Sequence, residues 1–259
     1  MPTASVTRVG PGSAGPGPAK PGLSGLAPLA AKTLVNQVVD AIVEASARGV
    51  FLPGDRIVEA EVARALEVSR IPVREALRLL ESQGVVVSER YRGMRLMSVD
   101  IDRLEKILKV RLALEKLAGA EIMALRQGQK GFLAPLDEML ARMHAAADAD
   151  DKFLVASLDT EFHMLLCRLS GNDTLLRCWE SLSRQLTIIF GLSTLKKSLK
   201  SIVAEHDEVI AALRTGDQAT YDRLMEVHIL EYSRAVDYEK LVEQLRKLDQ
   251  RQETRSGTA

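Results

Sequence analysis

The chain has 259 residues, of which 46% are hydrophobic and only 4% are aromatic, and its 35 basic and 35 acidic residues give a formal net charge of zero at pH 7. This neutrality excludes a generally basic nucleic-acid coat, so any DNA binding must come from a local group of arginines. No apolar run approaches the roughly 18 residues that a transmembrane helix needs. With so few aromatics, the core must be built mainly from Leu, Val, Ala and Ile, as in helical proteins.

The N-terminal residues 1–28 are predicted to form a disordered leader. Their Gly-Pro-rich stretch at 10–18 cannot bury enough apolar surface to fold, and the segment lacks the apolar centre of a signal peptide. The two cysteines, Cys167 and Cys178, form neither a CxxC motif nor a disulfide framework, and we interpret both as reduced core thiols. We therefore expect a cytoplasmic protein.

Residues 29–98 are predicted to form a winged helix-turn-helix. A first helix follows Thr33, a residue type that caps helices, and ends at Gly49. Two short helices separated by a tight break then precede two β-type runs, which we interpret as a hairpin with a basic tip. These elements are expected at residues 59–66, 71–83, 85–87 and 94–97.

The second short helix has the features of a DNA-recognition helix. Arg70, Arg74 and Arg78 recur every four residues and so share one face. Arginine suits this position because its fork bonds guanine bidentately or clamps phosphates. Ser69 before the helix offers a phosphate contact, and the opposite face is apolar, with Val73, Leu77 and Leu80.

Two further observations bear on this interpretation. Arg92, at the hairpin tip, is placed to enter the minor groove, and Gly93 allows the tight turn. The alternative is an ordinary solvated face, on which the arginines pair with Glu75 and Glu81.

The segment LPGDRIVEAEVARALEVSRIPVREALRLLESQGVV, followed by YRGMRL, resembles the winged helix-turn-helix of the GntR family. The resemblance implies that Arg70 and Arg74 contact DNA and that Arg92 and Gly93 form the wing tip. Two positions depart from the family pattern. Ala60 stands where an arginine often touches DNA, and Glu67 stands where a glycine is usual, which should strain or reshape the turn slightly.

From residue 101 to residue 238 the pattern is helical almost without interruption, and short loops predict antiparallel neighbours in a bundle. The fold class is therefore mainly α, with a small β-hairpin wing. A charged, helix-prone tail follows at 239–259. Six helices are expected, at about 101–127, 131–148, 150–170, 172–192, 196–215 and 217–238.

Three of the four histidines lie on apolar stripes of these helices, namely His163, His206 and His228, and Asp159 lies one helical step before His163. A buried carboxylate and three buried imidazoles are costly unless they are paired, and a divalent metal would satisfy all four. The mixed oxygen and nitrogen set suits Zn²⁺ or Ni²⁺ and leaves open positions. The alternative is three separate core histidines that bond within the protein. We interpret His144, on a stripe edge, as structural or exposed.

Arg111 also falls inside an apolar stripe, that of the helix at 101–127. A guanidinium that faces a core requires a carboxylate. That carboxylate is either Glu115 or another residue of the protein, in a structural salt bridge, or it belongs to an acidic ligand.

The second half resembles the FCD domain, the helical effector domain of the FadR branch of GntR regulators. The segments that carry this resemblance are VRLALEKLAGAEIMAL, LDTEFHMLLCRLSGNDTLL and EHDEVIAALRTGD, together with His228. The resemblance implies a metal held by Asp159, His163, His206 and His228, with a small organic acid bound there near Arg111. It also implies a homodimer, by default a repressor, that reads a near-palindromic operator.

Two rival functions remain open at this point. A metalloenzyme is the first, because a His/Asp metal with open positions can activate water, although no placed general base such as a HExxH glutamate occurs. The second is a regulator whose metal is purely structural, or that has none.

Overall fold

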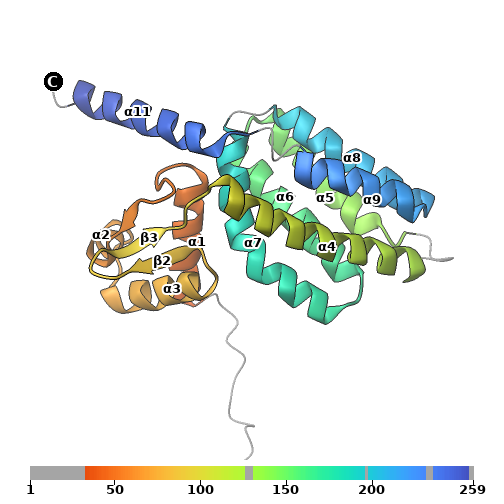
Figure 1. The fold of residues 1–259 in the computed structure, drawn as a ribbon, viewed down its shortest axis with the longest axis horizontal. Coiled ribbons are helices and arrows are strands. Elements are labelled where there is room, and N and C mark those ends of the chain that lie inside the picture. The colour runs from red at the N-terminus through yellow and green to blue at the C-terminus, as the bar shows by residue number, and fades with distance from the viewer. Residues whose placement is uncertain (1–32, 126–130, 196–197, 232–235, 257–259) are drawn as a thin grey trace, which may run out of the picture. The chain divides into compact units, whose positions relative to one another are not determined.

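In the computed structural model, residues 33–125, 131–195, 198–231 and 236–256 are described, with side chains up to residue 248. The predicted leader at 1–28 lies outside them. The first domain is a winged helix-turn-helix (Figure 1). Its elements are α1 (Leu34–Ala47), β1 (Arg56–Ile57), α2 (Glu59–Ala65), α3 (Arg70–Ser82), β2 (Val86–Glu89) and β3 (Gly93–Leu96).

The first helix begins as its sequence predicts. The Thr33 side chain accepts a hydrogen bond from the Asn36 backbone N–H, which satisfies an otherwise unpaired donor at the start of α1. Its apolar face, including Val39 and Ile42, is buried, and α1 packs against α3. This packing leaves the opposite face of α3, which carries the arginines, exposed to solvent.

The turn between α2 and α3 shows the expected strain. Glu67 has a φ of 54°, a left-handed conformation that costs a residue with a Cβ roughly 1–2 kcal/mol. Ser69 occupies the position before α3, but its side chain makes no capping hydrogen bond there. The Ser69 hydroxyl is therefore not used to cap the helix.

The wing is a three-stranded antiparallel sheet in the order β1-β3-β2. The hairpin of β2 and β3 matches the predicted basic hairpin, with Glu89 opposite Gly93. Tyr91 and Gly93 both have left-handed backbones, so the glycine supports the tight turn as predicted. The sequence analysis missed β1, which has only two residues and so carries no alternation to detect.

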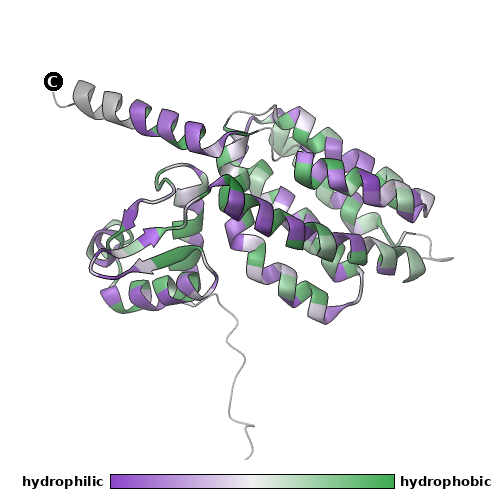
Figure 2. Ribbon diagram, viewed as in Figure 1, coloured by the Kyte–Doolittle hydropathy of each residue, from purple (hydrophilic) through white to green (hydrophobic). Residues whose placement is uncertain are grey.

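The second domain is an antiparallel helical bundle, as predicted, and Figure 2 shows that its helices carry both hydrophilic and hydrophobic residues along their length. The elements of this domain are α4 (Ile101–Leu125), α5 (Ala134–Asp148), α6 (Lys152–Leu169), α7 (Asp173–Thr194), α8 (Leu199–Thr215), α9 (Gln218–Glu226) and the π-helical turn η2 (Val227–Glu231). Helix α6 packs against α4, α5 and α7, and α8 packs against α5 and α9. The helix α11 (Tyr238–Ser256) comes after this domain in the chain.

One detail at the C-terminal end differs from the prediction. The last bundle helix ends earlier than residue 238, and α9 passes into the π-helical turn that carries His228. π-Helical turns are often found at functional sites. The charged tail is the regular helix α11, in agreement with its helix-prone sequence, and it begins at the buried residue Tyr238.

The interpretation of both cysteines as core thiols is half wrong. Both are free, but only Cys167 is buried, and Cys178 is exposed. On α7, Cys178 lies on the exposed face of the helix, whereas its neighbour Trp179 lies on the apolar face and is completely buried. Among the described residues, none of the helices combines the length and the apolar character that a membrane crossing requires.

Candidate recognition helix and candidate metal and effector site

Helix α3 is two-faced in the way its sequence predicts. Val73, Leu77 and Leu80 are completely buried, whereas Arg70, Arg74 and Arg78 are exposed. The arginine row is therefore presented to solvent over more than two helical turns.

The ion pairs of the arginine row agree in part with an ordinary solvated face and in part with a DNA-contacting face. Arg78 pairs with Glu75 at 3.0 Å, as on an ordinary solvated face. Arg74 instead pairs with Glu59 of α2, at 3.1 Å from Nη2 and 3.2 Å from Nε, and this hydrogen bond lowers the pKa of Glu59. Arg70 makes no salt bridge within the described part of the chain. An exposed pair of this kind is weak and can exchange its carboxylate for a phosphate or a guanine.

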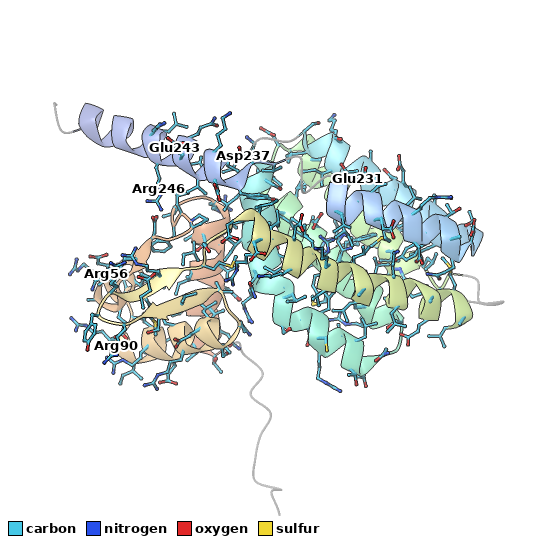
Figure 3. The ribbon with its side chains drawn as sticks, in the orientation of Figure 1. Arg56, Arg90, Glu231, Asp237, Glu243 and Arg246 are labelled. Atoms are coloured by element: carbon cyan, nitrogen blue, oxygen red, sulfur yellow. The ribbon has the colours of Figure 1, made fainter. Side chains whose placement is uncertain are left out.

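The wing carries the predicted Arg92 together with basic groups that the sequence analysis did not select as DNA contacts. Arg92 is exposed and lies 3.9 Å from Glu89. Arg90 stacks over Tyr91, and Arg56 of β1 lies beside Gly93. Figure 3 shows Arg56 and Arg90 extending outward from this domain. Arg56 could not be assigned from the sequence, because only the sheet brings it to the wing tip.

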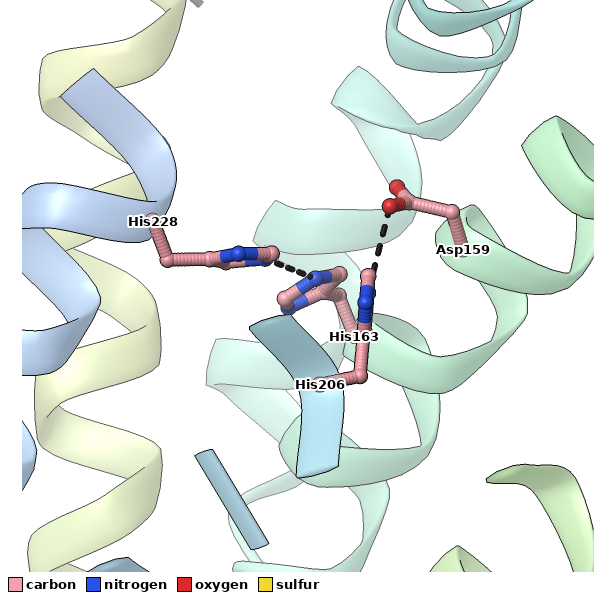
Figure 4. Close-up of side chains that lie close together, drawn as sticks. All are labelled: Asp159, His163, His206 and His228. Carbon is pink, nitrogen blue, oxygen red and sulfur yellow. Dashed lines mark hydrogen bonds and ion pairs between the residues drawn. The ribbon is translucent and has the colours of Figure 1, made fainter. Parts of the chain in front are cut away.

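In the helical domain, the four predicted metal ligands come together. Asp159, His163, His206 and His228 each offer one ligand atom, and these atoms all lie within 4.8 Å of one another (Figure 4). They come from α6, α8 and the π-helical turn. His163 and His206 are completely buried, and Asp159 is nearly so.

Each imidazole has its Nδ1 beside an outer acceptor. His206 Nδ1 lies 2.8 Å from the Ile202 carbonyl oxygen, His163 Nδ1 lies 2.7 Å from Glu115 Oε2, and His228 Nδ1 lies 3.3 Å from Glu205 Oε2. These acceptors favour the tautomer with the proton on Nδ1, which directs the Nε2 lone pair inward. Metal-ligating histidines typically have this outer-acceptor pattern.

With the imidazole protons on Nδ1, the inward atoms face one another as acceptors. His206 Nε2 lies 3.2 Å from Asp159 Oδ1, and His163 Nε2 lies 3.0 Å from His228 Nε2. Since the His206 Nδ1–H is used on a carbonyl, its Nε2 presents a lone pair to a carboxylate. His206 Nε2 and the second carboxylate oxygen of Asp159 have no hydrogen-bond partner among the described residues. A cation between these atoms would remove the repulsion.

The pKa shifts of these side chains also favour metal binding. Burial lowers the pKa of His163 well below 6.5, and burial followed by His206 and Arg111 lowers that of His228 to about 3. Burial raises the pKa of Asp159, but the neighbouring His206, together with His163 and Arg111, lowers it further than burial raises it. Neutral imidazoles and an ionised carboxylate are the forms that bind a metal.

Arg111 is buried, and both predicted explanations find support. Its Nε donates to Glu115 Oε1 at 2.7 Å, which is the structural salt bridge. Its guanidinium also lies 4.8 Å over the Phe190 ring, and its Nη2 has no partner within the described structure. The unpaired nitrogen leaves a donor for a ligand.

A small cavity of about 30 Å³ lies beside the cluster. Since a single water requires roughly 10–15 Å³ on this measure, the cavity has room for about two water-sized groups. Its polar lining comes from Arg111, Asp159, Ser193, Thr194, Glu205, His228 and Tyr238. Of these, the sequence analysis missed Ser193, Thr194, Glu205 and Tyr238, because none of them stands out from its own helix as a buried polar group on an apolar stripe.

His144 does not belong to the cluster. About half of its side chain is exposed, and its Nε2 lies 3.2 Å from Asp207. The prediction that it is structural or exposed is confirmed.

Comparisons with known proteins agree with this architecture. Residues 34–96 match the gntR family of bacterial regulatory proteins, and residues 106–231 match the FCD domain. The chain is 32% identical to an HTH-type transcriptional regulator of Agrobacterium vitis, over 51% of this chain and 78% of that protein. It is 28% identical to a probable D-xylose utilization operon transcriptional repressor of Paenarthrobacter nicotinovorans, over 77% of this chain and 87% of the relative. A gluconate operon transcriptional repressor of Bacillus subtilis is 25% identical, with coverages of 66% and 72%.

Solved structures show the same fold. Escherichia coli McbR/YncC superposes with a TM-score of 0.66 at 20% identity, covering 83% of this chain and 99% of that one. A GntR regulator from Rhodococcus sp. RHA1 gives 0.64 at 21% identity, with coverages of 79% and 97%. The fold and these family matches identify the chain as a DNA-binding transcription regulator rather than an enzyme. The chain belongs to the GntR family, with a C-terminal FCD domain.

Proposed function

We propose that this regulator binds a divalent metal ion at Asp159, His163, His206 and His228, and that a small carboxylate bound beside the metal controls its affinity for operator DNA. The observation that carries the metal site is the contact of His206 Nε2 with Asp159 Oδ1 at 3.2 Å. With the His206 proton on Nδ1, beside the Ile202 carbonyl oxygen, this contact brings two acceptors together. A metal ion would convert this repulsion into two ligand bonds.

The donor set selects the kind of ion. Three imidazole nitrogens and one carboxylate oxygen suit a borderline ion such as Zn²⁺ or Ni²⁺ better than Mg²⁺ or Ca²⁺, which prefer oxygen ligands throughout. When bound, the metal supplies positive charge and open coordination positions for a carboxylate.

The effector class follows from Arg111 and the cavity. The buried Nη2 of Arg111 lacks an acceptor, and a carboxylate is the group that a guanidinium binds best. The cavity has room for about one carboxylate group, so we infer a short organic acid whose carboxylate would bind between the metal ion and Arg111. Larger acids would need the lining to move.

DNA binding is assigned to α3 and the wing. In our proposal Arg70, Arg74 and Arg78 face the major groove, Ser69 contacts a phosphate, and Arg92 with Gly93 approaches the minor groove. Since GntR regulators are typically dimeric, we propose a homodimer that reads two related half-sites. Several relatives are named as repressors, which favours repression as the default activity.

Metal binding tests the proposal directly. Protein stripped with a chelator is titrated with Zn²⁺ and Co²⁺ by calorimetry, as wild type and as His206→Ala. We expect one ion per chain for the wild type and at least a 100-fold loss of affinity for the variant, because a ligand atom is removed.

His144→Ala is the matched control, since it removes a histidine outside the cluster and should bind like the wild type. If His206→Ala bound the metal as tightly as the wild type, the proposed site would be wrong.

A further inference from the structure

Glu115 occupies the centre of a buried polar network between α4, α6 and α7. Its side chain is completely buried. Its Oε1 accepts hydrogen bonds from Arg111 Nε at 2.7 Å and from Trp179 Nε1 at 2.8 Å. Both donors are themselves buried, so the position of the carboxylate is fixed from two helices.

The second oxygen of Glu115 reaches a candidate metal ligand. Its Oε2 lies 2.7 Å from His163 Nδ1, the distance of a charge-assisted hydrogen bond. Neither atom has a well-directed hydrogen bond within the described structure, so the ring N–H is out of line with the oxygen. A small rotation of the imidazole would align the pair without moving Glu115, which is anchored on its other side.

We propose that Glu115 is the positioning residue for His163, an inference that rests on the proposed metal site. By accepting the Nδ1 proton, its carboxylate fixes the tautomer in which His163 Nε2 is a lone pair. It also sets the angle at which that lone pair enters the site. Carboxylates that bond a ligating histidine in this way raise the basicity of the ligand and tighten metal binding.

The network requires a carboxylate rather than an amide. Three N–H groups, from Arg111, Trp179 and His163, converge on the two oxygens of Glu115. A glutamine would turn an NH₂ group toward at least one of these donors, because an amide has only one acceptor atom. Glu115→Gln therefore keeps the size of the side chain and disrupts the bonding.

The test compares Co²⁺ binding by wild type and Glu115→Gln, followed by the visible absorption of the bound ion. We expect the variant to bind Co²⁺ about 10- to 100-fold more weakly, with a shifted spectrum. The spectrum reports the ligand field at the metal, which a merely structural role of Glu115 would leave unchanged.

Tyr221→Phe is the matched control. The Tyr221 hydroxyl donates to the backbone carbonyl of Glu115 at 3.1 Å, so this variant removes a buried hydrogen bond at the same residue without touching its carboxylate. It should bind Co²⁺ like the wild type.

A measurement on the wild type keeps the inference testable even if Glu115→Gln does not fold. Long-range ¹H–¹⁵N correlation of the Zn²⁺-loaded protein should show His163 protonated at Nδ1 and metal-bound at Nε2. The opposite tautomer would overturn the inference, as would unchanged Co²⁺ affinity and spectrum in a folded Glu115→Gln. A wild type that binds no Co²⁺ or Zn²⁺ would overturn the proposed metal site and this inference with it.

Discussion

The histidines show how burial and hydrogen bonding set the chemistry of single residues. His206 Nδ1 lies beside a backbone carbonyl oxygen, and burial disfavours the charged forms of His163 and His228. This arrangement leaves the Nε2 lone pairs available to a metal ion.

The metal-free protein should lose stability as the pH falls below about 6.5. The folded-state pKa values of His163 and His228 are depressed, to about 3 for His228, so the unfolded chain binds more protons than the folded one in this window. The stability that the two neutral imidazoles contribute is complete above the unfolded pKa of about 6.5. It is lost as the pH falls below that value, down to about pH 3 for His228, at up to about 1.4 kcal/mol per pH unit for each group. Urea unfolding between pH 7.5 and 5 measures the slope.

A variant at one of these histidines tests their part in this profile. His228→Asn should flatten the slope, because it removes a buried imidazole whose pKa is depressed. A free energy of unfolding that was equal at pH 7.5 and pH 5 would contradict the account.

The four candidate ligands could be selected from the sequence because each is a polar residue on an apolar helical stripe. The residues that surround these candidate ligands could not be selected from the sequence in this way. Glu115 was recognised only as a possible partner of Arg111, since its contact with His163 depends on how α4 packs against α6. Glu205 and Tyr238 are brought to the site by tertiary packing, which leaves no local pattern.

At the scale of elements, long periodic helices were predictable and short or irregular pieces were not. The helices of the bundle follow their stripes and glycine breaks, with Gly171 and Gly216 in left-handed conformations at two of them. Strand β1 is too short to show alternation, and the π-helical turn at Val227–Glu231 continues the helical pattern of α9. Both lie at candidate functional positions, where local rules are often broken.

The role of α3 is tested by Arg70→Ala/Arg74→Ala. Each arginine that contacts a base contributes about 1–3 kcal/mol, so the double variant should lose at least about 10-fold in affinity for a DNA site selected with the wild type. Fluorescence anisotropy across a salt series measures the loss and should show a shallower salt dependence.

Arg177→Ala serves as the control, because Arg177 is an exposed arginine of α7 that bonds only Thr174 in the described structure. Equal DNA affinity of the wild type and the double variant would show that the arginine row is an ordinary solvated face.

At the scale of the whole molecule, the chain combines a winged helix-turn-helix domain with a helical domain in which we propose that a metal ion and a carboxylate bind. The histidine cluster favours the metal, and the unpaired Arg111 nitrogen favours the carboxylate. Allosteric control requires that the ligand bind two states of the protein with different affinity, with a coupling of about 1–3 kcal/mol in typical cases.

The most direct test of this account is the operator affinity of the metal-loaded protein with and without short carboxylates. The DNA is selected from a random pool, and acetate, lactate, succinate and citrate are added at saturating concentration and constant salt. We predict that at least one acid changes the dissociation constant by about 5- to 150-fold, and that Arg111→Lys abolishes the change. An unchanged dissociation constant with every acid, while metal and DNA remain bound, would contradict the central claim.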